Sequence, residues 1–183
     1  MTEQQPIQIV RRKVKYPRIV LKTEGLVLIM PYRGGYDANL LMEKHKKWIK
    51  NKLRFIGEIK KEFSNTKLFE RTEREFVDLV NGSVKNAANV LQVSPLRINL
   101  KYVKSKWGSC DRRGKVVLNV LLKYLPLDLI NYVVYHEMCH LVFLNHSKNF
   151  WQLVAKRFCD YKSCEKKLFG YWFLMNKQGF INK

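Results

Sequence analysis

The sequence predicts an α+β protein, because short β-like runs and longer stretches with helical apolar spacing alternate along its 183 residues. Three β-like runs come first, at Ile7–Val14, Arg18–Leu21 and Leu26–Met30. Proline, glycine and threonine separate them, and such residues end strands and form turns. We therefore expect an antiparallel β-meander over residues 1–35.

A long basic helix is predicted next, over residues 36–63. Asp37 is a suitable N-cap, and apolar residues follow at helical spacing to about Phe63. Basic residues crowd the other positions: Lys44, Lys46, Lys47, Lys50, Lys52, Arg54, Lys60 and Lys61. Such a run is either the solvated face of an amphipathic helix or a surface for phosphates, and both readings stay open.

Residues 64–183 are predicted to form one continuous globular unit that carries the chemistry. Thr72, followed three residues later by Glu75, resembles a capping box at the start of a helix. The expected elements are a helix over 72–91, strands over 97–104 and 115–121, and helices over 126–144, 149–159 and 164–175. A polar turn with two glycines joins the two strands.

Composition excludes several classes of protein. Apolar residues make up 46% of the chain, which suffices for a core. No apolar run reaches the ~18–20 residues of a membrane helix, and no secretory signal is visible, so we expect a cytoplasmic protein without a membrane partner. The cysteines form no Cys-x-x-Cys pair, which favours reduced, mostly buried thiols. They are Cys110, Cys139, Cys159 and Cys164.

The charge balance is strongly basic. Lys and Arg number 35 against 15 Asp and Glu, a net charge of +20. Such a surface attracts polyanions and is expected to bind DNA or RNA weakly at low salt. The alternative is a lysine-rich proteome that makes all surfaces basic, and composition does not separate the two.

Three of the four histidines lie within residues 136–146. On a helix, His136 and His140 leave the same face one turn apart, so their nitrogens can hold one Zn²⁺ at about 2.0–2.1 Å. Glu137 lies roughly 100° around the helix from His136. It flanks the metal, which is the place of a general base that acts on a water molecule.

His146 is the candidate third ligand, with one condition. If the helix simply continued, His146 would lie about 240° around it from His140. We therefore expect the chain to turn near Leu144–Asn145, with Asn145 left-handed and Ser147 capping the next helix. A fourth coordination position would stay open, as catalytic zinc sites require.

These residues resemble the YgjP-like family of minimal gluzincin-type metalloproteins, which are related to the SprT-like and WLM metalloproteases. One matching motif is His136-Glu-x-x-His140, with His146 after an asparagine and Phe150-Trp151 beyond it. The other is Lys104–Cys110, followed by Asn119. The resemblance implies a zincin-like catalytic domain and a zinc-dependent hydrolase, usually labelled a metallopeptidase. It also implies His136, His140 and His146 as metal ligands and Glu137 as the base.

Residues Trp107, Gly108 and Ser109 are candidates for substrate binding. They could form an edge strand beside the cleft, where an extended substrate adds as a further strand and Gly108 permits close backbone approach. The alternative is a hairpin turn with Trp107 packed in the core. Phe150 and Trp151 are interpreted as core residues that anchor the next helix.

Three functions remain open from sequence. The first is a zinc peptidase that acts on peptides or proteins. The second is a metal-dependent nucleoside triphosphate pyrophosphatase, which the basic surface suits, although three neutral histidines suit zinc better than magnesium. The third is a protease recruited by nucleic acid, or a module with a purely structural zinc.

Overall fold

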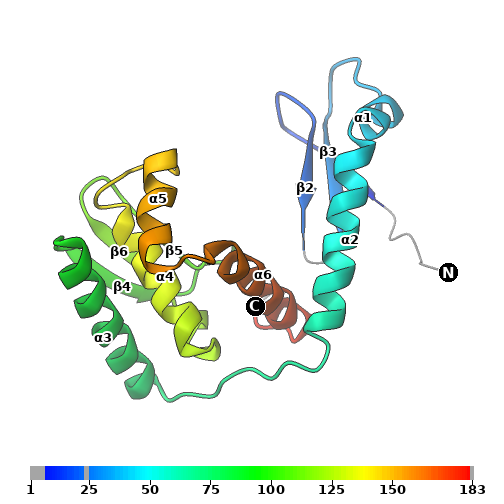
Figure 1. Cartoon of the computed structure of the whole chain (residues 1–183). Coiled ribbons are helices and arrows are strands. Elements are labelled where there is room, and N and C mark those ends of the chain that lie inside the picture. Colours follow the sequence, from blue (N-terminus) through cyan, green and yellow to red (C-terminus); the bar gives the residue numbers. More distant parts are fainter. Residues whose placement is uncertain (1–6, 23–24, 182–183) are drawn as a thin grey trace. The chain divides into compact units, whose positions relative to one another are not determined.

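The computed structural model describes residues 7–22 and 25–181, and Figure 1 shows the whole chain. It confirms the α+β class: helices accompany two three-stranded sheets. The chain divides into two compact units, of which the first contains residues up to Thr66 together with Trp172–Ile181 and the second contains Lys67–Tyr171. Helix α6 (Tyr161–Lys177) contributes residues to both.

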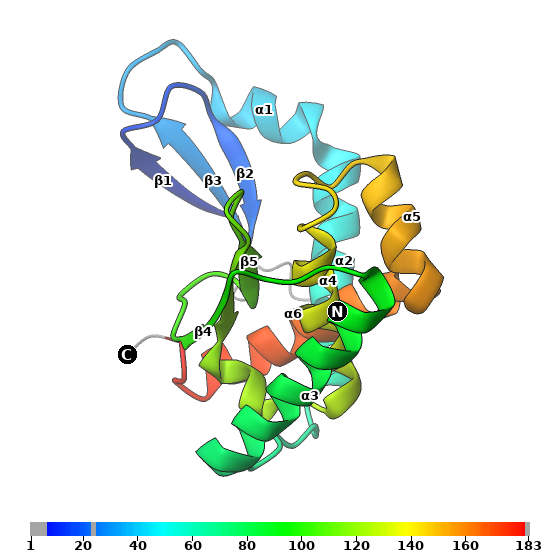
Figure 2. The same cartoon turned by 90° about the vertical axis from the view of Figure 1, so that its left-hand side faces the viewer.

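The first sheet is formed by β1 (Gln8–Arg12), β2 (Arg18–Leu21) and β3 (Leu26–Pro31), which lie side by side in Figure 2. Its order is β1-β3-β2, with β1 parallel and β2 antiparallel to β3. The predicted antiparallel meander is therefore wrong. Every residue of β3 is buried, so it takes the central position, and the strands that carry arginine take the edges.

The predicted long basic helix is wrong as one element, because two helices replace it. Asp37 caps α1 (Ala38–Lys44) as expected, accepting a hydrogen bond from the Asn39 N–H at 2.7 Å. His45, with φ −106° and ψ 13°, then interrupts the helix before α2 (Lys46–Glu62) begins. Helix α2 buries isoleucines, whereas α1 buries no residue. Burial therefore anchors the second helix and not the first.

The second unit begins with α3 (Glu73–Leu91), whose predicted capping box is confirmed. The Thr72 side chain accepts from the Glu75 N–H, and the Glu75 carboxylate accepts from the Thr72 N–H. Arg71 donates to the carbonyls of Lys123 and Leu125, at 2.6 Å each. These bonds tie the start of α3 to the short 3₁₀ helix η1 (Val120–Tyr124).

The second sheet contains β4 (Arg97–Lys101), β5 (Gly108–Cys110) and β6 (Lys115–Asn119) in the order β4-β6-β5. Strand β4 is parallel and β5 antiparallel to β6. The expected strands at 97–104 and 115–121 are present in shorter form, and β5 lies in the segment interpreted as a turn or an edge strand. It is the edge strand that the structure shows.

Helix α4 (Leu127–Cys139) is the core of this unit, since most of its residues are buried. Helix α3 packs along it, and the Ser83 hydroxyl of α3 donates to the side-chain oxygen Oδ1 of Asn131 in α4 at 2.6 Å. Helix α5 (Lys148–Arg157) follows, capped by Ser147 as predicted. Helix α6 is longer than the short helix expected over 164–175.

Candidate metal centre

The end of α4 sets the position of the first two histidines. The helix ends at Cys139, and His140 is its C-cap. The last turn tightens, because the His140 N–H donates to the Glu137 carbonyl and the Leu141 N–H to that of Met138. The predicted continuation to Leu144 is therefore wrong.

The early stop gives the chain room to bring His146 back. The Nε2 atoms of His136 and His146 lie 3.0 Å apart, and one ring nitrogen from each of the three histidines lies within 4.8 Å of the others. Asn145 is not left-handed, since Gln92 is the single described non-glycine residue with positive φ. The turn is spread over residues 140–146, so no strained residue is needed.

Two aromatic residues of α5 pack directly on the imidazoles. Phe150 is fully buried and stacks on His140, with ring centroids 4.5 Å apart. Trp151 stacks on His146 at 5.3 Å, and its indole also stacks on Tyr161 at 4.8 Å. Sequence reasoning treated both only as core residues. The signal that could have indicated these contacts is their position in the first turn after the Ser147 cap. Because the cap sets where the helix begins, it also sets which way these two side chains point.

The protonation states of the rings suit metal binding. His140 Nδ1 lies 3.0 Å from the Phe143 carbonyl, an oxygen that can only accept, so Nδ1 carries the proton and the Nε2 lone pair is free. Burial, assisted by His140 and His146, lowers the pKa of His136 to about 3. Burial also lowers the pKa of His140. Neutral imidazoles are the form that binds a metal ion.

The three histidines fit a divalent metal ion. Without an ion, two Nε2 atoms at 3.0 Å can share only one proton between them. Two nitrogens bound at about 2.0–2.1 Å to one tetrahedral ion would lie roughly 3.3 Å apart, close to the observed separation. Nδ1 of His136 is buried with no hydrogen-bond partner among the described residues, so only Nε2 of this ring has a polar contact, the one to His146.

Glu137 lies against the backbone of strand β5. Its side chain is only 7% exposed, and burial raises its pKa to about 7, with Lys106 acting in the opposite direction. A Cβ atom added to Gly108 would lie 2.7 Å from both Cγ and Oε1 of Glu137, closer than such atoms approach one another. Residue 108 must therefore be glycine if the carboxylate is to keep this position.

Strand β5 pairs only with β6, so within the described part of the chain its other edge has no strand partner. The Trp107 carbonyl accepts from the Asn119 N–H at 2.8 Å, and the Asp111 N–H donates to Lys115 at 3.0 Å. Because an antiparallel strand alternates its hydrogen-bonding direction, Trp107, Ser109 and Asp111 face β6. The backbone groups of Gly108 and Cys110 therefore point to the open edge.

Asn119 is a site residue whose role sequence reasoning missed. It is fully buried, and its Nδ2 donates to the carbonyls of Val103 and Lys106 at 2.7 and 2.8 Å. Its Oδ1 accepts from the Leu121 N–H at 3.1 Å. One amide thus holds the segment before β5 in place. A lone asparagine inside the apolar run Val116–Leu122 is the signal that could have indicated this.

The family model described as YgjP-like, metallopeptidase domain, matches residues 60–170, which is more than half of the chain. The chain belongs to the YgjP-like family. It is thus a metallopeptidase domain, whose activity needs a divalent metal ion and whose substrates are peptides or proteins.

Two solved structures are similar to part of this YgjP-like chain. The metallopeptidase zymogen abylysin of Pyrococcus abyssi is 22% identical, with a TM-score of 0.45, over 54% of this chain and 93% of that one. The zymogen jannalysin of Methanocaldococcus jannaschii is 21% identical, with a TM-score of 0.43, over 49% and 90%. No curated protein matches the chain. Among the described residues, no helix combines the length and apolar character that a membrane crossing requires.

Other polar side chains of the YgjP-like domain are less available for chemistry. Tyr132 and Tyr135 are buried, and the Tyr132 hydroxyl donates to the Glu165 carboxylate. All four cysteines are free, as expected, but the expectation that most are buried is wrong: only Cys139 is buried, Cys110 and Cys164 are half-buried, and Cys159 is exposed. Burial raises the pKa of the Cys110 thiol to about 11, which disfavours the thiolate that a nucleophile needs.

A cavity of about 350 Å³ lies beside His140. Its wall combines apolar side chains with one acidic and one basic residue: Val93, Ser94, Asp111, Arg112, Gly114, His140, Leu141 and Leu144. Asp111 follows β5 directly, so the cavity adjoins the end of the edge strand.

Proposed function

We propose that this metallopeptidase domain is a zinc enzyme in which His136, His140 and His146 hold the metal and Glu137 is the general base. The proposal rests on three imidazole nitrogens that lie within 4.8 Å of one another. His136 belongs to α4, His140 is the C-cap of α4, and His146 follows in the next turn. Glu137 directly follows the first of these ligands in α4. This is the arrangement expected of His-Glu-x-x-His sites.

Zinc is favoured over other divalent ions by the donor set. Three neutral nitrogens with no carboxylate ligand suit zinc, whereas magnesium and calcium prefer oxygen. When bound, zinc polarises a carbonyl group and lowers the pKa of a water molecule to about 7. The stacked Phe150 and Trp151 hold the His140 and His146 rings in fixed orientations.

Glu137 is proposed to move the proton during hydrolysis. Its carboxylate accepts a proton from the attacking water and returns it to the leaving amine nitrogen. The backbone of Gly108 supports the carboxylate from one side, so the group is positioned before substrate binds. Glutamate at this position is therefore both ordered and close to the edge strand.

The substrate is proposed to bind β5 as an added strand. Of the three predicted substrate-binding residues, Gly108 directs its own N–H and C=O to the open edge. Trp107 and Ser109 use theirs to pair with β6, so they position the strand. The cavity beside His140 is the place for a substrate side chain next to the cleaved bond.

Metal content tests the ligand set. Purified protein loaded with zinc should contain about one ion per chain, and His146→Ala should lose tight binding because one of three protein ligands is gone. The matched control is His45→Ala, which removes the exposed histidine between α1 and α2. It should keep full zinc. Full occupancy in His146→Ala, measured by elemental analysis after dialysis, would exclude that residue from the site.

A further inference from the structure

One end of the first sheet gathers basic residues from three segments. Because β1 and β2 flank β3, residues 13–17 cross the end of β3, where Pro31 leads into Tyr32. The register pairs Arg12 with Pro31 and Arg18 with Ile29, so both arginines lie near this end. We call this surface the basic end. It consists of Arg11, Arg12, Lys13, Lys15, Tyr16, Arg18, Tyr32 and Arg33, all exposed.

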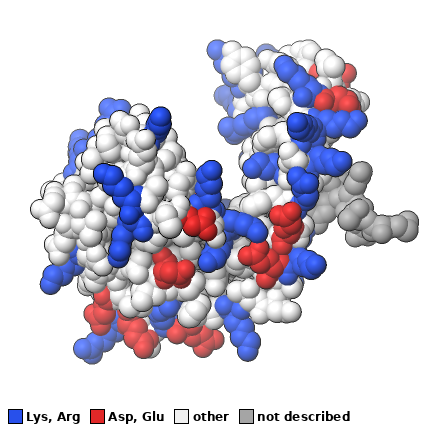
Figure 3. Space-filling view, viewed as in Figure 1, with Lys and Arg blue, Asp and Glu red and all other residues white. Residues whose placement is uncertain are grey.

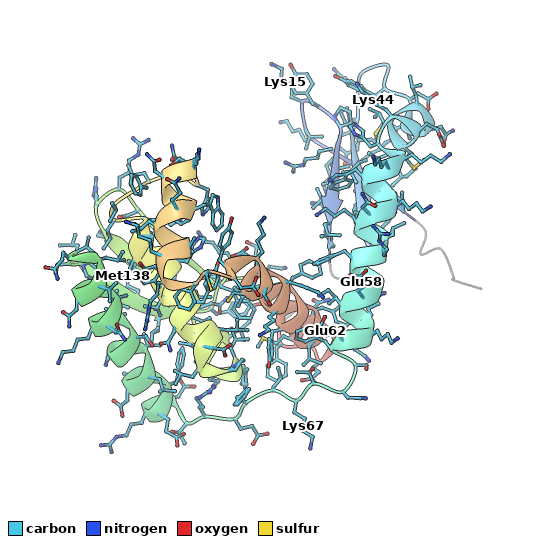
Figure 4. The ribbon with its side chains drawn as sticks, viewed as in Figure 1. Lys15, Lys44, Glu58, Glu62, Lys67 and Met138 are labelled. Atoms are coloured by element: carbon cyan, nitrogen blue, oxygen red, sulfur yellow. The ribbon has the colours of Figure 1, made fainter. Side chains whose placement is uncertain are left out.

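Among the described residues, few acidic side chains offset this charge: on the nearby α1, Glu43 pairs with Lys46 at 3.3 Å. Residues 7–22 and 25–36 contain no Asp or Glu, and the next acid, Asp37, is engaged as the cap of α1. Lys44 of α1 lies at the same end of the unit as Lys15, whereas Glu58 and Glu62 lie toward the other end of α2 (Figure 4). Figure 3 shows blue side chains gathered over this end, with a smaller red group beside them. The field here is strongly positive.

Two exposed aromatic rings accompany the charges. Tyr16 is 61% exposed and Tyr32 is 67% exposed, so the fold buries little of either ring. The Lys15 ammonium lies 5.2 Å from the centre of the Tyr16 ring. Exposed aromatic faces among Lys and Arg are the combination with which proteins bind single strands, because every unpaired base offers a face for stacking.

We propose that the basic end binds single-stranded nucleic acid, DNA or RNA. Lys13, Lys15 and Arg18 contact phosphates, and Tyr16 and Tyr32 stack on bases. A duplex hides its base faces and leaves the two tyrosines without a role. An anionic membrane would be met by charge together with an inserted apolar helix face, whereas these residues belong to a strand end and a turn. The proposal concerns binding, and it goes beyond peptide hydrolysis.

The test is fluorescence anisotropy of the full chain with labelled single-stranded DNA and RNA about 20 nucleotides long, and with the matching duplex. The variant Tyr16→Ala/Tyr32→Ala should bind single strands about tenfold more weakly or worse, with duplex affinity unchanged. Affinity falls as salt rises, and in the variant Lys13→Gln/Lys15→Gln/Arg18→Gln this fall should be less steep. The slope of log affinity against log salt should lose about 2 in magnitude, since each phosphate contact contributes about 0.7.

The matched control removes the same charge elsewhere. Lys85→Gln/Lys101→Gln/Lys162→Gln changes three exposed lysines of the second unit and should keep affinity within about twofold near physiological salt. Glu137→Gln should bind strands like the wild type, which separates this proposal from the peptidase mechanism. Equal loss in both triple variants would overturn the proposal. So would intact single-strand binding in the tyrosine variant, or phosphatidylserine vesicles binding more tightly than either strand.

Discussion

The two sheets of the protein share one strand arrangement and use it differently. Their orders are β1-β3-β2 and β4-β6-β5, and in each the first strand is parallel and the second antiparallel to the central strand. Pro31 and Asn119 hold equivalent positions, since Pro31 pairs with Arg12 and Asn119 with Lys101. Each lies where the connection between the outer strands crosses the central strand.

The two connections differ at the residue where they cross the central strand, Asn119 in one sheet and Pro31 in the other. The Asn119 amide binds two carbonyls of residues 103–106 and so fixes the approach to β5, whose Gly108 supports Glu137. Pro31 has no amide side chain, and residues 13–17 beside it carry exposed charge and an exposed tyrosine. One strand arrangement thus orders the strand beside Glu137 in one unit and displays a basic surface in the other.

The largest expected effect comes from filling the contact between Gly108 and Glu137. Gly108→Ala places a methyl group 2.7 Å from the carboxylate, which must move. Peptide hydrolysis should fall about 10²-fold, as for a displacement near 1 Å, while zinc content stays near one ion per chain. Initial rates and elemental analysis on the same preparation measure both quantities.

The control for this change is Gly82→Ala in helix α3, where an added Cβ meets no atom within 4 Å. It should leave the rate unchanged and stabilise the fold by about 0.5–1 kcal/mol. Equal rates for Gly108→Ala and wild type would show that Glu137 does not need its observed position.

An effect on stability rather than on rate is expected from the crossing residue itself. Asn119→Ala removes three hydrogen bonds from a fully buried group and leaves their partners without replacement. The free energy of unfolding should drop by about 2–4 kcal/mol. Chemical denaturation measures it, with Asn86→Ala on the exposed face of α3 as the control, for which about 0.5 kcal/mol or less is expected. A loss below 1 kcal/mol for Asn119→Ala would contradict the comparison of the two crossings.

The smallest effect is expected at the start of α3. Thr72→Ala breaks the capping box of α3 and should lower stability by about 1 kcal/mol, with zinc content and rate unchanged. Thermal unfolding provides the measurement. A change in rate at full zinc occupancy would mean that α3 affects the site through more than stability.

Local signals in the sequence predicted local structure well. The Asp37 cap, the Thr72–Glu75 capping box and the Ser147 cap are each defined by neighbours along the chain, and all are confirmed. The spacing of the three histidines likewise predicted that they meet, because two lie one helical turn apart and the third follows a short turn.

Features that depend on distant segments were not predictable in this way. Strand β3 is central because both of its faces are buried. An apolar run in the sequence fits a central strand and the last strand of a meander equally well, so it could not predict the strand order. The break at His45 depends on tertiary packing, because α2 buries side chains and α1 does not. The contact between Gly108 and Glu137 brings strand β5 against helix α4. These segments are distant in sequence, so residue spacing could not predict it.

The central claim is that Glu137 is the general base of a zinc peptidase, and Glu137→Gln tests it most directly. The change keeps size and shape and leaves all three histidines. With zinc-loaded protein and a denatured protein substrate, the variant should keep its zinc and lose hydrolysis by at least ~10²-fold. A nucleoside triphosphate panel assayed in parallel should show no turnover by either protein. Undiminished peptide hydrolysis in Glu137→Gln, or triphosphate cleavage without peptide cleavage in the wild type, would contradict the claim.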